Sequence, residues 1–442
     1  MHNILAFHLN LKNILKFVLP SMLMMVFLSS YVMVDGIFIS HYVGANGLSA
    51  SNIVYPILNI CWAIALMLAT GGCALVSRQM GEDKAQLAKE TFSAIVYFGL
   101  IISVILGAIF MYFLEDVIYF LGSTKELYQY CWDYAVVAIL FFPMMMMQVF
   151  SQHFLIARGR PKYAMLAIII AGIVNMVLDY VFIGLFDWGL KGAAFATGIG
   201  FSCVGIFGLI YFTKNRIATL YFTRPNLDYK AIVESMTNGS SEMVTQFATA
   251  LVIFLFNITM MKYVGSQGVA AISVILYLQF LLAAIFLGYA TGASPLFSFS
   301  FGRQDYTRIK TLFSYSLKIC IVLALCIFSF CWVFEYYLVG FFIKEQELFD
   351  MTLRGLRFMS ISFLFAGFNI LASALFTSLS NGKVSAFLSF SRSFLFLAPA
   401  IVILPKFWGE IGVWLAIPVA EFTFFLLSML VIFAYRAKYK YF

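Results

Sequence analysis

The chain has 442 residues, of which 63% are hydrophobic and 11% are charged, and its mean hydropathy is +0.96. Soluble domains carry about 25% charged residues, so this composition excludes an ordinary soluble protein and indicates a chain whose surface faces lipid. The net charge of +8 comes from basic residues scattered between apolar runs. That pattern is typical of membrane topology signals and does not indicate a nucleic-acid partner.

Twelve apolar runs follow one another along the chain, each long enough to cross a bilayer as a helix. We expect spans at residues 16–40, 51–77, 91–114, 127–153, 162–185, 190–212, 231–261, 269–298, 309–334, 351–376, 383–405 and 411–435. Membrane barrels are instead built from strands of about ten residues with alternating polarity. The sequence therefore predicts an all-α integral membrane protein with twelve transmembrane helices.

Lys and Arg are unevenly distributed among the gaps between these spans. Nineteen lie near the two ends of the chain and in the even-numbered gaps, against seven in or beside the odd-numbered gaps. Because cytoplasmic loops are enriched in Lys and Arg, we expect both termini in the cytoplasm. The prediction is a multi-pass protein of the cell membrane.

The second part of the sequence repeats the first. With a shift of 221 residues, residues 42–81 and 263–302 share fourteen of forty residues without a gap. The identities include the pairs Gly71 with Gly292 and Gly81 with Gly302. A shared apolar bias would not align these glycines, so the repeat is structural.

Six spans in each repeat give the two repeats the same orientation. We expect a first half at residues 1–212, a polar cytoplasmic linker at 213–229 and a second half at 230–442. The two six-helix bundles would then be related by a pseudo-twofold axis along the membrane normal. Parallel repeats of this kind recur in secondary transporters, whose substrate sites lie between the halves near the midplane.

Two acids in the first half are expected inside the membrane. Asp35 lies in the first span and Asp179 in the fifth, with Asn175 one helical turn before Asp179. Charged groups are costly in hydrocarbon and mark functional sites by default. Together these side chains could carry a proton or bind Na⁺, and the alternative is that each carboxylate caps a helix end or accepts a local hydrogen bond.

The second half contains three charged residues within its spans. Glu242 in the seventh span is either part of a vestibule for a cationic substrate or an acid at a helix start. Arg392 and Glu421 are at similar depth in the last two spans, so we expect them to form a structural ion pair.

Other residues indicate bending and an adaptable cavity. Pro20 and Pro143 interrupt expected helices and would allow them to bend. The run after Pro143, with Met144, Met145 and Gln148, could line a cavity for varied ligands, although Met and Phe more often face lipid. The seven cysteines lack metal-ligand spacing, and no phosphate loop or nucleophile motif is present. We therefore expect neither an enzyme nor a metal cofactor.

Several segments in the same order resemble the multidrug and toxic compound extrusion (MATE) family over essentially the whole chain. They are "LPSMLMMVFLSSYVMVDGIFISHYVG", "ATGGCALVSRQMGEDK", "ARGRPKYAM", "NMVLDYVFIG" and "WGLKGAAFATGIG". The resemblance implies a cation-coupled exporter with an acidic network in its first half.

The matching positions here are Asp35, Asn175, Asp179 and Thr197, with Pro20 at the family's first-helix bend. The chain departs from a symmetric pattern, because the 221-residue shift places Phe256 and Ala400 opposite Asp35 and Asp179.

The sequence thus predicts an antiporter that exports amphipathic, often cationic organic compounds in exchange for H⁺ or Na⁺. We expect small-molecule substrates, contact with membrane lipid, no cofactor beyond the coupling ion, and a monomer. The nearest alternative is a flippase for lipid-linked saccharides, which would need a cationic central cavity. A membrane-embedded transferase would need a loop cluster of acids or histidines, and an uncoupled receptor or channel would leave the repeat and the buried acids unexplained.

Overall fold

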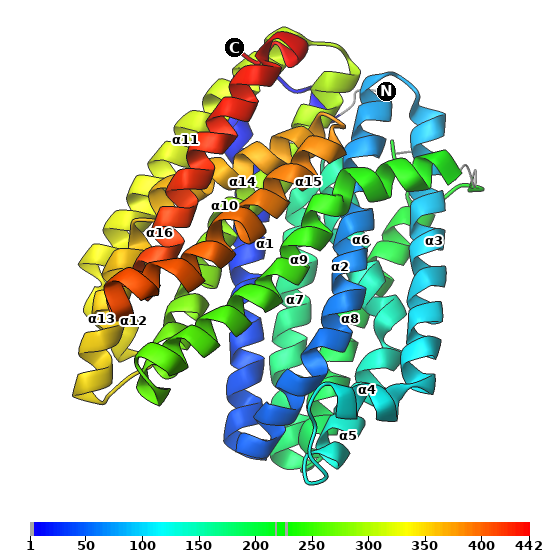
Figure 1. Cartoon of the computed structure of the whole chain (residues 1–442). Helices are drawn as coiled ribbons and strands as arrows, with labels where there is room; N and C mark the ends of the chain where they lie inside the picture. Colours follow the sequence, from blue (N-terminus) through cyan, green and yellow to red (C-terminus); the bar gives the residue numbers. More distant parts are fainter. Residues whose placement is uncertain (1–3, 217–218, 226–228) are drawn as a thin grey trace.

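The computed structural model describes residues 4–216, 219–225 and 229–442, and every regular element within these ranges is a helix (Figure 1). The α-helices are α1 (Leu11–Phe38), α2 (Ala45–Gly81), α3 (Ala85–Tyr112), α4 (Leu114–Phe120), α5 (Tyr128–Leu140), α6 (Phe142–Ala157), α7 (Pro161–Asp179), α8 (Gly189–Lys214), α9 (Tyr229–Tyr263), α10 (Ser266–Gly302), α11 (Tyr306–Val333), α12 (Glu335–Gly340), α13 (Gln346–Ser360), α14 (Phe363–Ser378), α15 (Gly382–Phe390) and α16 (Ala398–Tyr439). One 3₁₀ turn and three π-helical turns complete the set: η1 (Ile4–Ala6), η2 (Ile39–Val43), η3 (Tyr180–Leu185) and η4 (Ser391–Leu397).

Most of the expected spans are present as continuous helices. In the described part of the chain, nine helices are long and apolar enough to cross a membrane, and up to eleven if two bent pairs each count as one span. The expected spans at 127–153 and 351–376 are each built from two helices that meet at a bend. The first consists of α5 and α6, bent by 54°, and the second of α13 and α14, bent by 49°.

The two expected proline effects differ. Pro143 lies in the first turn of α6, directly after the break at Phe141, where its missing N–H and fixed φ favour a new helix start. Pro20 instead lies buried inside α1, which continues through it. The expected bend at Pro20 stays a prediction.

The last two expected spans form one helical stretch of 58 residues from Gly382 to Tyr439. Gly409 interrupts it with φ 55° and ψ −131°, so two helices join across a kink there. This backbone conformation is open to glycine and strained for other residues.

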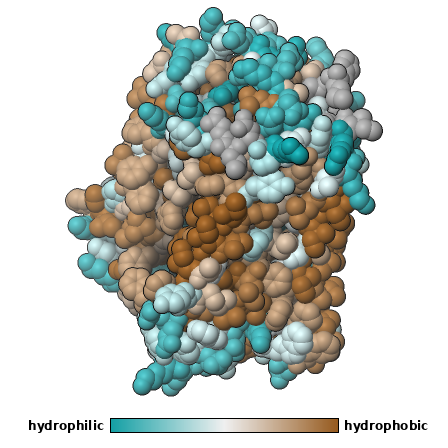
Figure 2. All heavy atoms as spheres, turned by 90° about the vertical axis from the view of Figure 1, so that its right-hand side faces the viewer, coloured by the Kyte–Doolittle hydropathy of each residue, from teal (hydrophilic) through white to brown (hydrophobic). Residues whose placement is uncertain are grey.

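Both termini and the connection between α8 and α9 lie at one end of the molecule, at the top in Figure 1. We call it the terminal end, and the opposite end the far end. Figure 2 shows apolar side chains gathered across the middle of one face and polar side chains at both ends. This distribution, with the many apolar helices, is that of a multi-span membrane protein.

The expected linker at 213–229 lies partly outside the described residues, which omit 217–218 and 226–228. In the described part, α8 ends at Lys214 and α9 begins at Tyr229. Leu220 is fully buried, and Phe222 stacks on Phe92 with ring centroids 5.0 Å apart. This segment is therefore packed against the first half.

The apolar core has two parts. The larger one runs through the first half and continues into the second at the terminal end, with residues such as Leu296 and Phe313. The smaller one lies within the second half and includes Phe256 and Trp414. Across the halves, α2 packs against α9 and α10, and α1 packs against α10.

Candidate ion-binding site

The two expected acids of the first half lie on different helices, and each is followed by a π-helical turn. Asp35 is near the end of α1, just before η2, and Asp179 is the last residue of α7, directly before η3. Such turns shift the register of the following backbone and are frequent at functional sites. Asp179 is fully buried and Asp35 is partly buried.

Asn175 and Thr197 are brought together beside these acids. Asn175 is one turn before Asp179, so both side chains project from the same face of α7. The Nδ2 of Asn175 donates a hydrogen bond to Oγ1 of Thr197 on α8 at 3.4 Å. The Oδ1 of Asn175 is buried, and no donor among the described residues bonds to it.

The carboxyl groups of Asp35 and Asp179 lie close enough to interact electrostatically, because α1 packs against α7. Within the described part of the chain, no N–H or O–H donor bonds to Oδ1 of Asp35 or to either oxygen of Asp179. Ionised carboxylates only accept hydrogen bonds, so two of them side by side repel. A shared proton or a bound cation would remove that repulsion.

A small cavity of about 10 Å³ adjoins this site. Its volume is near the minimum that one water molecule needs. It is lined by Tyr31, Ala171, Asn175, Thr197, Gly200 and Phe201. Carboxylate, amide and hydroxyl oxygens of this kind are ligands for hard cations, so the residues present fit a proton, a water or a Na⁺ ion.

Two tyrosines near the acids were not predicted from the sequence. Tyr31 lies one turn before Asp35 on α1, and its hydroxyl is beside the amide of Gln148 on α6. Tyr134 on α5 is close enough to both Asp35 and Asp179 to interact with them electrostatically. The four-residue spacing could have indicated Tyr31, whereas no local signal links Tyr134 to the acids.

The other expected ligand-contacting residues lie elsewhere. Glu242 on α9 is partly buried, and it has no hydrogen bond or ion pair with a described residue. Met145 is 2% exposed within the core of the first half, and Met144 lies against α8 beside Gly205. Their role in substrate binding stays a prediction.

Arg392 and Glu421 pair across η4 and α16. The Nε and Nη2 of Arg392 donate to Oε1 of Glu421 at 2.8 and 2.6 Å. Asn369 on α14 donates from Nδ2 to Oε2 of Glu421 at 2.6 Å, a partner that the sequence did not indicate. Both oxygens of the carboxylate are therefore hydrogen-bonded, as a buried charge requires.

The repeat relates this ion pair to the small cavity. The 221-residue shift places Arg392 on Ala171, and the shift of 220 that aligns Trp408 with Trp188 places Glu421 on Phe201; both Ala171 and Phe201 line the cavity. Uncharged side chains thus lie in the first half where the second half holds a paired cation and anion. The candidate ion site is consequently built in one half.

Comparisons with known proteins agree with this architecture. The MatE family model matches residues 20–181 and 243–403. The multidrug export protein MepA of Staphylococcus saprophyticus subsp. saprophyticus is 22% identical over 432 residues, covering 97% of this chain and 94% of that protein.

Two solved structures share the fold. A MATE crystal structure in complex with MaL6 matches with a TM-score of 0.95 at 20% identity, covering 100% of this chain and 99% of that one. The outward-facing conformation of a multidrug resistance MATE family transporter of the MOP superfamily matches with a TM-score of 0.90 at 22% identity. The match covers 97% of this chain and 96% of that chain. Because the family model matches most of the sequence in two consecutive segments, the chain belongs to the multidrug and toxic compound extrusion family.

Proposed function

We propose that the protein is a secondary antiporter that exports amphipathic, often cationic organic compounds in exchange for H⁺ or Na⁺. Membership in the MATE family and similarity to multidrug export proteins support export of this substrate class. The observation that carries coupled exchange is the pair Asp35 and Asp179, one partly and one fully buried, whose buried carboxyl oxygens have no hydrogen-bond donor among the described residues.

The exchange follows from competition between access states. A ligand shifts a conformational equilibrium only by its difference in affinity between the states. Cation binding at the pair removes the repulsion between the carboxylates and would favour one state, while substrate favours the other. One charge moving inward supplies about 2.3 kcal/mol per 100 mV of membrane potential.

The test is transport in proteoliposomes that contain the purified protein and a fluorescent organic cation. A pH gradient and a Na⁺ gradient are imposed separately, and substrate-dependent movement of each ion is recorded. Antiport predicts substrate accumulation driven by one gradient, with movement of that ion in the opposite direction. Equal substrate flux with and without either gradient would reject coupling and leave a passive carrier.

A flippase for lipid-linked saccharides remains the second candidate. It would use an unpaired cation to hold the phosphate groups of its substrate. In the described residues, Arg392 instead bonds to Glu421, which favours the exporter.

We further propose the full architecture expected from the sequence. Counting each bent pair as one span and dividing the last stretch at Gly409 yields twelve spans, six on each side of the linker at 213–229. The lobes would be residues 1–212 and 230–442, in a monomer with lipid around it. Glu242, Met144, Met145 and Gln148 would contribute to a vestibule or substrate surface.

Orientation can be tested with single cysteines placed in a version lacking the seven native cysteines. Positions Asn46 and Lys125 should react with an impermeant thiol reagent added to intact cells, because both are exposed at the far end. Positions Asp83 and Asn215, exposed at the terminal end, should react only after the membrane is opened. External labelling at Asn215 would overturn the cytoplasmic placement of the termini.

A further inference from the structure

The two halves of the chain meet backbone to backbone near the terminal end. At the crossing of α2 with α9, a Cβ on Gly71 would overlap the carbonyl oxygen of Ser235, and a Cβ on Gly239 would overlap that of Met67. Ser235 Oγ also donates to the Leu68 carbonyl oxygen at 3.1 Å across this crossing. Only glycine allows so close an approach.

The same arrangement recurs where α10 meets the first half. A Cβ on Gly302 would overlap the carbonyl oxygen of Arg78, and a Cβ on Gly81 would overlap that of Phe299. Gly292 packs against Ser21 of α1, where a Cβ would lie 3.1 Å from the serine side chain. Gly71 and Gly292, and Gly81 and Gly302, are the pairs matched by the sequence repeat.

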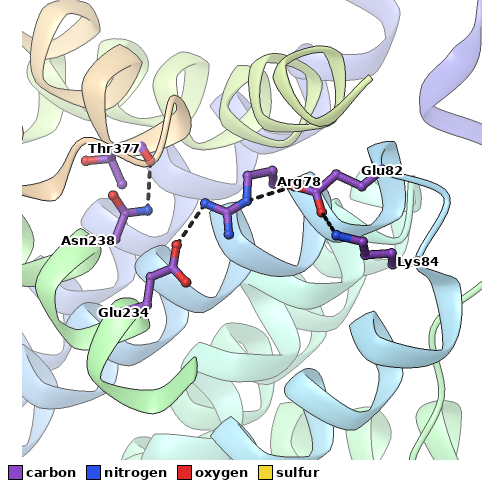
Figure 3. Close-up of polar contacts among 6 residues, drawn as sticks. All are labelled: Arg78, Glu82, Lys84, Glu234, Asn238 and Thr377. Atoms are coloured by element: carbon purple, nitrogen blue, oxygen red, sulfur yellow. Dashed lines mark hydrogen bonds and ion pairs between the residues drawn. The ribbon is translucent and has the colours of Figure 1, made fainter. Parts of the chain in front are cut away.

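Arg78 adds a charged contact across this seam and forms ion pairs with two carboxylates (Figure 3). Its Nη1 donates to Glu234 Oε1 on α9 at 2.8 Å. Its Nε lies 3.4 Å from Glu82 Oε1 on its own chain segment, yet this buried Nε makes no hydrogen bond. Glu82 also accepts a hydrogen bond from Lys84 Nζ at 2.7 Å, so it lies between two cations while Arg78 bonds to the other half.

A second arginine joins the halves at this end. Arg308, at the start of α11, donates from Nη1 to the Phe7 carbonyl oxygen at 2.9 Å and from Nη2 to that of Leu5 at 2.6 Å. Among the described residues, the hydrogen bonds and ion pairs between the halves lie on the side of the molecule toward the terminal end. At the far end, the second half instead has its own apolar core.

We propose that this seam is the gate at the cytoplasmic end and that Arg78, which pairs with both Glu234 and Glu82 here, keeps only Glu82 as the gate opens. When the gate is closed, Arg78 bonds to Glu234 and holds α2 against α9. When the halves part, Arg78 leaves Glu234 and closes up on Glu82, so its charge keeps a partner in both states. A stranded charge would raise the cost of opening, and the remaining pair with Glu82 avoids it. The inference rests on the proposed alternating transport.

The test measures gate opening directly. Spin labels replace Lys162 and Lys383, which are exposed at the terminal end in different halves, in the cysteine-free protein in lipid nanodiscs. Pulsed electron resonance then yields the populations of short and long distances. Glu234→Gln should raise the ratio of long to short distances about twofold, as expected for an exposed pair. Glu82→Gln should lower it, because it removes the partner of the open state.

Glycine variants probe the seam independently of charge. Gly239→Ala should raise the same ratio about tenfold, since overpacking a backbone contact is costly. Gly107→Ala is the matched control, because a Cβ there would lie 3.5 Å from its nearest neighbour. It should leave the distances unchanged. If Gly239→Ala fails to fold, the Glu234→Gln and Glu82→Gln variants still test the proposal.

Glu234→Gln and Glu82→Gln should change the ratio of long to short distances in opposite directions. That result would distinguish two carboxylates with different roles from a contact that only holds the gate closed. A change of this ratio in the same direction in both variants, or no change in either variant, would overturn the proposal. The measurement needs no transport. The expected shifts in the variants, together with no coupled efflux by the wild type, would refute the proposed function alone. Coupled efflux by the wild type without the shifts in the variants would refute the gate alone.

Discussion

Replacing Asp35 or Asp179 with asparagine is expected to abolish gradient-driven efflux while the protein stays folded and still binds substrate. Asparagine keeps the side-chain shape and removes the charge that would bind the coupling ion. One charge crossing 100 mV is worth about 2.3 kcal/mol, which corresponds to about a fiftyfold concentration ratio. We expect the accumulation ratio in energised proteoliposomes to fall to one in either variant.

The double variant should be scarcely worse than either single variant, because the two carboxyls would serve one cation. Asp187→Asn is the matched control. Asp187 is exposed in the turn before α8 with φ 55°, a conformation that asparagine tolerates. Its efflux should equal that of the wild type. Gradient-dependent efflux at the wild-type level in the Asp35 and Asp179 double variant would exclude this site and direct attention to Glu242.

Breaking the pair between Arg392 and Glu421 is expected to destabilise the fold more than removing both charges. Loss of one partner from a buried pair costs about 3–5 kcal/mol, and the lower value applies here because the Arg392 side chain is 27% exposed. Glu421→Gln should be the more harmful single change, since arginine keeps its charge. In Arg392→Gln, Glu421 keeps the hydrogen bond that its Oε2 accepts from Asn369 Nδ2 at 2.6 Å.

Apparent melting temperatures in detergent, at matched expression, would measure this order. We expect Glu421→Gln to melt lowest, Arg392→Gln next, and the double glutamine variant above both. Arg354→Gln is the control, because Arg354 pairs with Glu410 at 3.5 Å while its own side chain is 58% exposed. Such a pair contributes about 0–1 kcal/mol. Equal stability of the two Arg392 and Glu421 single variants and their double would show that the pair is not structural and make Arg392 a substrate-site candidate.

Local sequence was sufficient wherever the controlling interaction is short in range. Long apolar runs predict helices because a span must satisfy its backbone hydrogen bonds internally, and most expected spans are helical. The four-residue spacing placed Asn175 and Asp179 on one face of α7 for the same local reason. Similar depth in neighbouring spans was sufficient to suggest that Arg392 would meet Glu421.

Breaks within spans were harder to predict, because a helix can continue through proline or stop beside it. Pro143 lies just after a 54° bend, whereas α1 continues through Pro20. The difference depends on what surrounds each proline, and hydropathy does not record it.

By itself, the sequence determined that this is a helical membrane protein with an internal repeat, a family resemblance and few charges within its spans. Only the tertiary structure decided which distant groups meet. Asp35 lies near Asp179 because α1 packs against α7, and Tyr134 of α5 is also close to both acids. Arg78 bonds to Glu234 because glycines let α2 and α9 touch. Such contacts depend on helix packing, which periodicity along one helix cannot specify.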